Sequence, residues 1–306
     1  METSSSLPRV DIYARVTSQI IEAIEAGVGE YQMPWHQGSA GFPRNAITRN
    51  PYRGVNTLAL WSASRIRGYT SPYWATYRQW STQGAQVRKG EKASEIVFFK
   101  RETEERKNEN EGTVTARERL VVRGSSVFNA DQVDGWFKAE VLPENRTEHL
   151  VSVDAFVSGI GADIRYGGDV AGYNRSSDCI HMPERRRFIG TETSTVTEAF
   201  YSVLLHEHVH WSGHPKRLNR ELSGRFGDCA YAMEELVAEL GAAFLCADLG
   251  INLDPRLDHA AYVYVWLVVL RQQRTAIVTA SGAAIRACRY LGELALGEQR
   301  AARVSQ

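Results

Sequence analysis

The pattern His-Glu-x-x-His at residues 206–210 constrains this chain more than any other feature of its sequence. It consists of His206-Glu207-His208-Val209-His210 and follows a stretch whose apolar residues favour a helix. In a helix, residues four apart share a face, so His206 and His210 can direct two imidazole nitrogens at one ion. Glu207 lies one position around the helix, where its carboxylate suits water bound to that ion. The pattern therefore predicts a helical zinc site with Glu207 as the catalytic base.

A catalytic zinc site needs a third protein ligand, and the next strong helix supplies candidates. Residues 231–239 (YAMEELVAE) carry Glu234, Glu235 and Glu239. Glu235 and Glu239 are four apart, so one can bind the metal while the other orients a ligand histidine. An isolated pair of glutamates would more simply solvate a helix face, but the upstream histidines favour the metal. We prefer Glu235 as the ligand, keep Glu239 as the alternative, and expect Glu234 to turn away.

Other polar residues near this pattern receive different roles. His208 faces elsewhere on the helix and His214 lies beyond its end, so we expect both to pack or to form hydrogen bonds instead of binding metal. Tyr173, His181 and Tyr231 are candidates for polarising a substrate carbonyl. The sequence does not choose among these three.

The overall balance of 36 basic and 36 acidic residues conceals a basic segment in the first half of the chain. Between Arg44 and Arg101 there are eleven basic residues against two acidic ones, a local net charge of plus nine. Aromatic residues are interleaved with them. Cations along phosphates and aromatic faces that stack on bases are typical of proteins that bind single-stranded nucleic acid. The candidate DNA contacts are Arg53, Trp74, Tyr77, Arg78, Trp80, Arg88, Lys89 and Lys92.

Two features within this segment lead to sharper expectations. Several aromatic residues must belong to a core, but polar neighbours surround Trp74 and Trp80, so at least one of these rings is expected to be exposed for stacking. Arg88 and Lys89 are the preferred phosphate contacts, because Gly84 and Gly90 beside them let a backbone approach closely.

Composition narrows the class of protein. The four cysteines are far apart and form no CxxC pair, which argues against a disulfide scaffold and favours a reducing, cytosolic compartment. Residues 1–15 lack the apolar stretch of a signal peptide. The longest apolar run, residues 262–270, is far below the roughly 20 residues needed to span a bilayer. We therefore expect a cytoplasmic protein with no membrane partner.

The pattern of elements predicts an α+β chain of two domains. Apolar spacing predicts a helix from about Asp11 to Gly27. Strands are expected at 95–99 and 119–128, joined by a charged, solvated loop at 102–118. Further helices are expected at 151–160, 194–211, 230–249, 257–274 and 279–296, with short strands between 164 and 183. We divide the chain into a small mixed domain at 1–142 and a mostly helical domain at 143–306.

A series of motifs, in order along nearly the whole chain, resembles the ArdC-type antirestriction proteins. They are Pro34-Trp35, Pro43-Arg-Asn45, Tyr52-Arg-Gly-Val-Asn56, Trp74-Ala-Thr-Tyr77, Gly84-Ala-Gln-Val-Arg-Lys-Gly90, Val127-Phe-Asn-Ala-Asp-Gln132, His206-Glu-His-Val-His-Trp211, Arg217-Leu-Asn-Arg220 and Tyr231-Ala-Met-Glu-Glu-Leu-Val-Ala-Glu239. TraC-type conjugative primases carry a similar N-terminal domain. His208 departs from the resemblance, because leucine is usual at that position.

The resemblance implies a single-stranded-DNA-binding domain followed by a zincin-like metallopeptidase domain, carried on mobile elements and protecting entering DNA from host restriction. The expected mechanism is hydrolysis assisted by a zinc ion (Zn2+) held by His206, His210 and Glu235, with a protein substrate or restriction-system component as a possible partner. Two alternatives stay open: a non-enzymatic DNA-shielding protein with a structural or vestigial metal, and a replication accessory factor resembling the primase-linked module.

Overall fold

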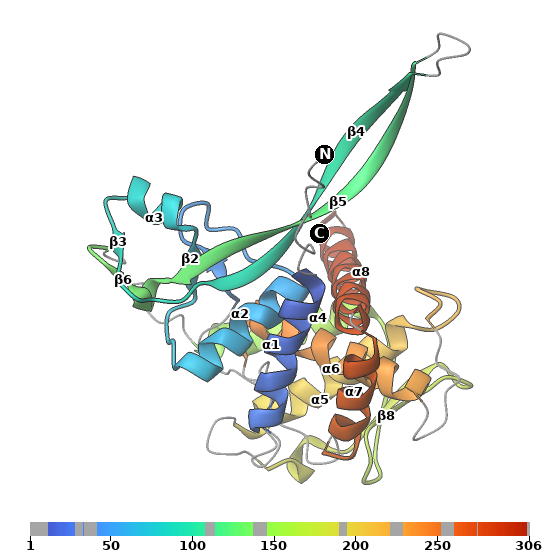
Figure 1. Cartoon of the computed structure of the whole chain (residues 1–306). Helices are drawn as coiled ribbons and strands as arrows, with labels where there is room; N and C mark the ends of the chain where they lie inside the picture. Colours follow the sequence, from blue (N-terminus) through green and yellow to red (C-terminus); the bar gives the residue numbers. More distant parts are fainter. Residues whose placement is uncertain are drawn as a thin grey trace, which may run out of the picture.

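The chain has an α+β architecture, as the sequence predicts, in which helices gather below a long two-stranded ribbon (Figure 1). The structure is a computed structural model that describes residues 12–27, 33, 42–107, 114–136, 146–189, 195–220, 229–251, 260–273 and 275–304. Within these ranges, no helix combines the length and the apolar character that crossing a membrane requires.

The first half of the chain builds a four-stranded sheet flanked by helices. The strand order is β1-β2-β5-β4, with β1 and β2 parallel and the other pairs antiparallel, and β3 pairs with β6. The elements are α1 (Ile12–Gly27), β1 (Arg44–Asn45), α2 (Val55–Arg67), β2 (Tyr73–Ala75), α3 (Tyr77–Thr82), β3 (Gln86–Val87), β4 (Ser94–Lys107), β5 (Val114–Asn129), the 3-10 turn η2 (Ala130–Gln132) and β6 (Val133–Asp134).

The predicted first helix is confirmed, and its apolar face is buried. Val16, Ile20 and Ile24 of α1 are at most 1% exposed. Helix α2 is tied to the outer strand β4 by Asn56, whose side-chain amide donates to the carbonyl of Val97 at 2.7 Å and accepts from its N–H at 2.8 Å. This side chain thus satisfies backbone groups that an edge strand would otherwise leave unpaired.

The prediction of a charged loop at 102–118 is wrong, because most of these residues belong to the two-stranded ribbon that β4 and β5 form. Their antiparallel register runs without interruption from Ser94 opposite Val127 to Lys107 opposite Val114. The register sets Glu102 opposite Arg119. The base of the ribbon contributes Val97 to the core, and the ribbon extends from there away from the body (Figure 1). Only residues 108–113 separate the strands, and they lie outside the described residues.

The second half is a group of packed helices with a small sheet against α5. Its strand order is β7-β9-β8, with β7 parallel and β8 antiparallel to β9. All the helices predicted here are found, although the last runs beyond its predicted end at 296. The elements are α4 (Arg146–Ile160), β7 (Asp163–Tyr166), β8 (Gly172–Asn174), β9 (Cys179–Met182), the 3-10 turn η3 (Arg185–Arg187), α5 (Val196–Ser212), α6 (Cys229–Leu249), α7 (Ala260–Gln272) and α8 (Ala276–Val304).

One hydrophobic core joins the two halves. Residues of α1 and α2 and Val97 of β4 belong to the same buried cluster as residues of α5 to α8. At its centre the rings of Phe42, Trp61 and Phe244 lie 5.7 to 6.0 Å apart, which joins the N-terminal half to α6. The predicted division between residues 142 and 143 falls outside the described residues and stays a prediction.

The His-Glu-x-x-His helix α5 is held close to α6. Thr195 and Glu198 cap its first turn reciprocally: the Glu198 N–H donates to the Thr195 hydroxyl at 3.2 Å, and the Thr195 N–H donates to the Glu198 carboxylate at 2.8 Å. Further along, a Cβ added to Gly241 of α6 would lie 2.7 Å from a methyl carbon of Val209. The absence of a side chain at Gly241 therefore sets how closely the two helices approach.

We expect Gly241→Ala to destabilise the protein by about 1 to 3 kcal/mol, because the new methyl group overpacks a contact with a stiff β-branched side chain. Urea unfolding measures the change. Gly292→Ala is the matched control: Gly292 is also helical and a Cβ there meets nothing within 4 Å, so it should stabilise by up to about 1 kcal/mol. Adding Val209→Ala to Gly241→Ala should recover part of the loss; equal stabilities of Gly241→Ala and the wild type would contradict the packing argument.

Candidate metal centre and nucleic-acid surface

Three side chains from α5 and α6 converge on one point. The Nε2 atoms of His206 and His210 are 3.1 Å apart. The Glu235 carboxylate from α6 lies 3.5 Å from the His206 Nε2 and 3.6 Å from the His210 Nε2. One ligand atom from each of these three residues lies within 4.8 Å of the others. Among the described residues, this is the one group of three or more histidine, cysteine or acidic side chains that is close enough to hold a metal ion.

The opposite ring nitrogens of both histidines face other carboxylates of α6. Glu239 lies 3.7 Å from the Nδ1 of His206, the ring nitrogen opposite the one that faces Glu235. Glu234, expected to turn away from Glu235, lies 3.2 Å from the Nδ1 of His210, a contact that the spacing of the glutamates did not predict. The two imidazole planes are inclined by 74°, and carboxylates on different faces of α6 therefore reach them from different sides. Such carboxylate–histidine contacts fix the ring orientation in metal sites.

Arg220 holds Glu234 beside His210, a role that no spacing in the sequence predicts. Its guanidinium donates to both Glu234 oxygens, at 2.7 and 3.0 Å. The same group donates to the Ser212 hydroxyl at 2.9 Å and to the Val209 carbonyl at 2.6 Å. Arg220 thereby joins the end of α5 to α6. Its position at the end of the Arg217–Arg220 motif was the available signal.

The electrostatics of the cluster favour positive charge at its centre. Burial alone would lower the pKa of His210, but hydrogen bonds to Glu234 and Glu235 outweigh it and raise the pKa to about 10. Burial works to raise the pKa of Glu235, yet hydrogen bonds from His206 and His210 hold that pKa well below its usual range. The carboxylates therefore stabilise a cation where the imidazoles meet.

Glu207 is buried beside the cluster and is held by the small sheet. One of its carboxylate oxygens accepts a hydrogen bond of 2.9 Å from the backbone N–H of Tyr173 in β8. Of the three candidates for polarising a carbonyl, Tyr173 is thus the one shown to contact Glu207. The ring of His181 lies 3.3 Å from the sulfur of Cys179, and Tyr231 is half-buried at the start of α6.

The Tyr173 hydroxyl belongs to a network of its own. It donates to Asp178 at 2.8 Å and accepts from Arg217 at 3.2 Å. Burial, reinforced by the Asp178 contact, raises the pKa of Tyr173 above its ordinary value. The Arg217 guanidinium also donates to Asp178 at 3.1 Å and lies 3.8 Å from the centre of the Trp211 ring. The network connects the loop after α5 to strand β8 beside Glu207.

His208 is not a ligand, in agreement with the sequence analysis. It is completely buried, and its Nδ1 lies 2.8 Å from the Leu204 carbonyl. Its Nε2 has no hydrogen-bond partner among the described residues. Burial lowers the pKa of His208 to about 4, so a neutral imidazole fills this position of the core. His214, also excluded as a ligand, accepts a hydrogen bond of 3.1 Å from the Lys216 N–H.

The Asp178–Arg217 pair predicts a pH-dependent contribution to stability. The hydrogen bond from Arg217 lowers the pKa of Asp178 from 3.8 to about 2, although desolvation opposes it. A carboxyl whose pKa is lower in the folded state stabilises the fold above pH 3.8, and this contribution is lost as the pH falls towards 2. We therefore expect Asp178→Asn to destabilise at pH 7 by no more than about 1 kcal/mol, since the pair is partly exposed.

Urea unfolding at pH 7 and at pH 3 checks this expectation: the difference between Asp178→Asn and the wild type should shrink at the lower pH. Asp163→Asn is the control, because Asp163 and its partner Arg165 are about half exposed and such pairs contribute little. A pH-independent difference for Asp178→Asn would contradict the assignment.

The expectation that Trp74 or Trp80 is exposed for stacking is wrong. Trp74 is 1% exposed and Trp80 is 0% exposed. The indole N–H of Trp80 donates to the Phe128 carbonyl at 3.1 Å. Each ring packs against aromatic neighbours on its own side of the sheet: Trp74 against Tyr69, and Trp80 against Trp136. All three residues of β2 around Trp74 are buried, and the exposed polar residues near Trp80 lie on the other face of α3, which sequence proximity does not reveal.

The remaining candidate contacts reach solvent. Tyr77 is 51% exposed, and Phe98, which the site assignment omitted, is 43% exposed. The register places Phe98 opposite Arg123 on the ribbon, so the structure supplies a different pair of accessible rings from the one expected. The exposed cations among the candidates are Arg53, Arg78, Arg88, Lys89 and Lys92.

Arg88 forms ion pairs within the fold, and among the described residues no such pair involves Lys89. Arg88 forms ion pairs with Glu91 at 3.0 Å and Asp134 at 3.4 Å. The Glu91 N–H donates to the Arg88 carbonyl at 3.3 Å, and Gly90 has a φ of 90°, so residues 88–91 form a turn that requires glycine in its third position. Arg88 therefore holds this turn, which presents Lys89 to solvent.

Comparisons with known proteins match both halves of the chain. A family model for the N-terminal domain of anti-restriction factor ArdC matches residues 10–128, and one for a zincin-like metallopeptidase matches residues 151–283. The crystal structure of the antirestriction protein ArdC from plasmid R388 in its metal-free form has a TM-score of 0.74 and 39% identity, covering 94% of this chain and 98% of that one. Its Mn(II)-bound form has a TM-score of 0.71 and 38% identity, covering 93% and 98%.

Two further relatives differ in length. The uncharacterized protein y4eC of Sinorhizobium fredii is 46% identical over 90% of this chain and 89% of its own length. The DNA primase TraC of Escherichia coli is 35% identical over 88% of this chain but only 26% of its own length. The chain thus spans about a quarter of that primase.

Proposed function

This chain belongs to the ArdC family of antirestriction proteins, and from that premise we propose that it binds single-stranded DNA and carries a zinc-dependent peptidase centre, protecting entering DNA from restriction. The observation that carries the peptidase half of the proposal is the convergence of His206, His210 and Glu235 on one point beside Glu207. A protein substrate or a restriction-system component is the class of partner that such a centre would cleave.

The side chains present fit a zinc ion. Two imidazole nitrogens and one carboxylate oxygen are the three protein ligands of many catalytic zinc sites, which leave a further position open. The Mn(II)-bound structure of the R388 protein supports a divalent metal in this family. Carboxylates at Glu234 and Glu239 behind the two histidines also fit, because they orient imidazoles towards a metal.

A zinc ion held there would supply Lewis-acid activation of water and of a peptide carbonyl. Glu207 is then the general base: it accepts the proton of the attacking water and can return it to the leaving amine. The N–H of Tyr173 donates to one Glu207 oxygen and so helps to hold the carboxylate in place. Because Glu207 is buried, its carboxylate is kept away from competing bulk water.

Glu207→Gln should keep zinc bound and reduce hydrolysis of a substrate protein by at least 100-fold, since an amide cannot accept the proton. Zinc content by mass spectrometry and cleavage assays measure the two effects. Survival of entering plasmid DNA in a restricting host, with the same variant, separates an enzyme from a protein that only shields DNA. Undiminished hydrolysis by purified Glu207→Gln would rule out this mechanism.

Metal affinity should depend on Arg220 as well as on the ligands. Arg220→Ala releases Glu234 and so frees the His210 ring; loss of such an outer contact weakens zinc binding about 10- to 100-fold. His206→Ala, which removes a ligand, should abolish stoichiometric binding. Competition with a chromophoric chelator measures both. Lys216→Ala, an exposed residue of the same loop, is the control, and an Arg220→Ala affinity equal to that control would disprove the role.

The DNA half of the proposal is supported by segregated charge and accessible rings. Arg78, Lys89 and Lys92 are exposed, and Tyr77 and Phe98 offer faces on which bases can stack. The similarity to the primase TraC over this region supports a nucleic-acid partner. Because stacking faces are common to all bases and hidden in a duplex, binding should favour single strands with little base preference.

Replacing Lys89 and Lys92 together by alanine should weaken binding of a thymidine oligonucleotide and lower the salt slope by about 1.4, at about 0.7 for each lost phosphate contact. Tyr77→Ala should cost about 1 to 3 kcal/mol if its ring stacks on a base. Fluorescence anisotropy between 50 and 300 mM salt measures both. The charge-matched control is Arg175→Ala with Lys216→Ala in the second half; equal losses in the two double variants would reduce the effect to net charge.

A further inference from the structure

A cavity of about 330 Å³ lies where the two halves of the chain meet. The N-terminal half contributes the residues around the start of α2, and the C-terminal half contributes α6 and α8. The lining residues are Phe42, Arg53, Gly54, Phe244, Asp248, Ile285, Cys288 and Arg289. The cavity is large enough for one nucleotide, and its wall combines aromatic, aliphatic and cationic groups.

The two arginines of this cavity come from different halves. Arg53 and Arg289 are both exposed, and no salt bridge or side-chain hydrogen bond joins either of them to another described residue. One acid, Asp248, lines the same cavity. Burial raises the pKa of Asp248, although Arg53 and Arg44 oppose that shift. Two cations against one acid in the lining favour an anionic ligand.

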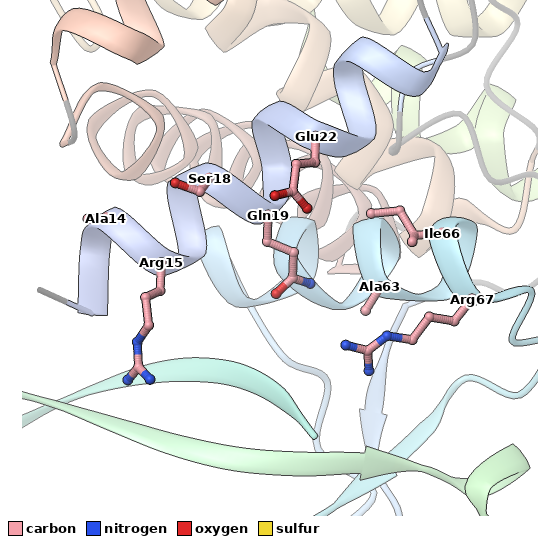
Figure 2. Close-up of a pocket in the computed structure, with 8 residues that line it drawn as sticks. All are labelled: Ala14, Arg15, Ser18, Gln19, Glu22, Ala63, Ile66 and Arg67. Atoms are coloured by element: carbon pink, nitrogen blue, oxygen red, sulfur yellow. The ribbon is translucent and has the colours of Figure 1, made fainter. Parts of the chain in front are cut away.

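A second groove, of about 430 Å³, is lined by two arginines that already have partners in the fold (Figure 2). It lies between α1 and α2, and Figure 2 shows Arg15 and Arg67 extending from these helices towards the strands beneath. Arg15 pairs with Glu95 at 3.6 Å, and Arg67 donates to the Lys92 carbonyl at 2.8 Å. Both arginines already bind groups of the protein itself. The cavity where the two halves meet, called the junction cavity below, is therefore the better anion site.

The apolar wall of the junction cavity depends on a close backbone approach. Gly54 has a φ of 61°, and a Cβ there would lie 2.8 Å from the terminal carbon of Ile285. The missing side chain lets the start of α2 reach α8 and brings Arg53 to the cavity. On the other side the rings of Phe42 and Phe244 lie 6.0 Å apart. Apolar walls beside guanidinium groups suit a base and its phosphate.

We propose that one nucleotide of a bound single strand enters this junction cavity, with its phosphate contacting Arg53 and Arg289 and its base against the apolar wall. The inference rests on the proposed DNA binding and extends it, because Arg289 belongs to α8 in the C-terminal half of the chain. Asp248 and Glu235 lie thirteen residues apart on α6, which places the cavity about 20 Å from the metal cluster along that helix. The strand would therefore contact both halves of the protein.

The test compares two arginines of α8 in the full chain. Arg289→Ala should weaken binding of a thymidine oligonucleotide and lower the salt slope by about 0.7, which corresponds to about fivefold at 0.1 M salt. Arg286→Ala is the control, because Arg286 is exposed on the same helix and does not line the cavity. Arg53→Ala should match Arg289→Ala, and Asp248→Asn should strengthen binding by removing a group that repels phosphate.

The outcomes separate this inference from the proposed function. If the wild-type chain binds no single strand at low salt, the proposed function itself fails. If it binds and Arg289→Ala equals Arg286→Ala in affinity and slope, the cavity is not part of the DNA path. Inorganic phosphate and thymidine monophosphate are the competing probes. The proposal is overturned if only the Lys89 and Lys92 substitutions weaken binding of the strand while the cavity still binds free phosphate. The cavity would then be a site for a small anion.

Discussion

The close approach of α5 and α6 is the constraint on which the candidate centre depends. Helix α5 presents His206 and His210, but the carboxylates that face them come from α6. Gly241 has no side chain, and the two helices can therefore meet against Val209 at a distance that lets Glu235 reach both imidazoles. The same approach brings Glu234 and Glu239 to the outer nitrogens. Wider spacing would leave two histidines without a common third ligand.

The centre is also supported from outside the helix pair. Arg220 returns from the loop after α5 to hold Glu234, and strand β8 holds Glu207 through the N–H of Tyr173. One arginine and one backbone N–H thus hold two of the acidic side chains near the histidines. The cluster carries more negative charge than its histidines balance, which is the electrostatic reason that it suits a cation.

The two halves of the chain share one hydrophobic core. The rings of Phe42, Trp61 and Phe244 pack across the junction, so the basic segment and the candidate metal centre belong to one packed body within the described residues. Buried tryptophans support this arrangement: the rings of Trp74 and Trp80 serve the core of the sheet, and cations and two other aromatic residues remain at the surface.

The sequence alone determined the local features of this protein: the α+β class, the first helix, the helix that carries His206 and His210, and the segregation of positive charge. Each follows from spacing within a few residues of the chain, where periodicity and charge act directly. Tertiary structure alone decided the contact of Glu234 with His210, the role of Arg220, the burial of Trp74 and Trp80 and the cavity between α2 and α8. These depend on how elements distant in sequence meet, because the face a side chain presents is set by the neighbour that packs against it.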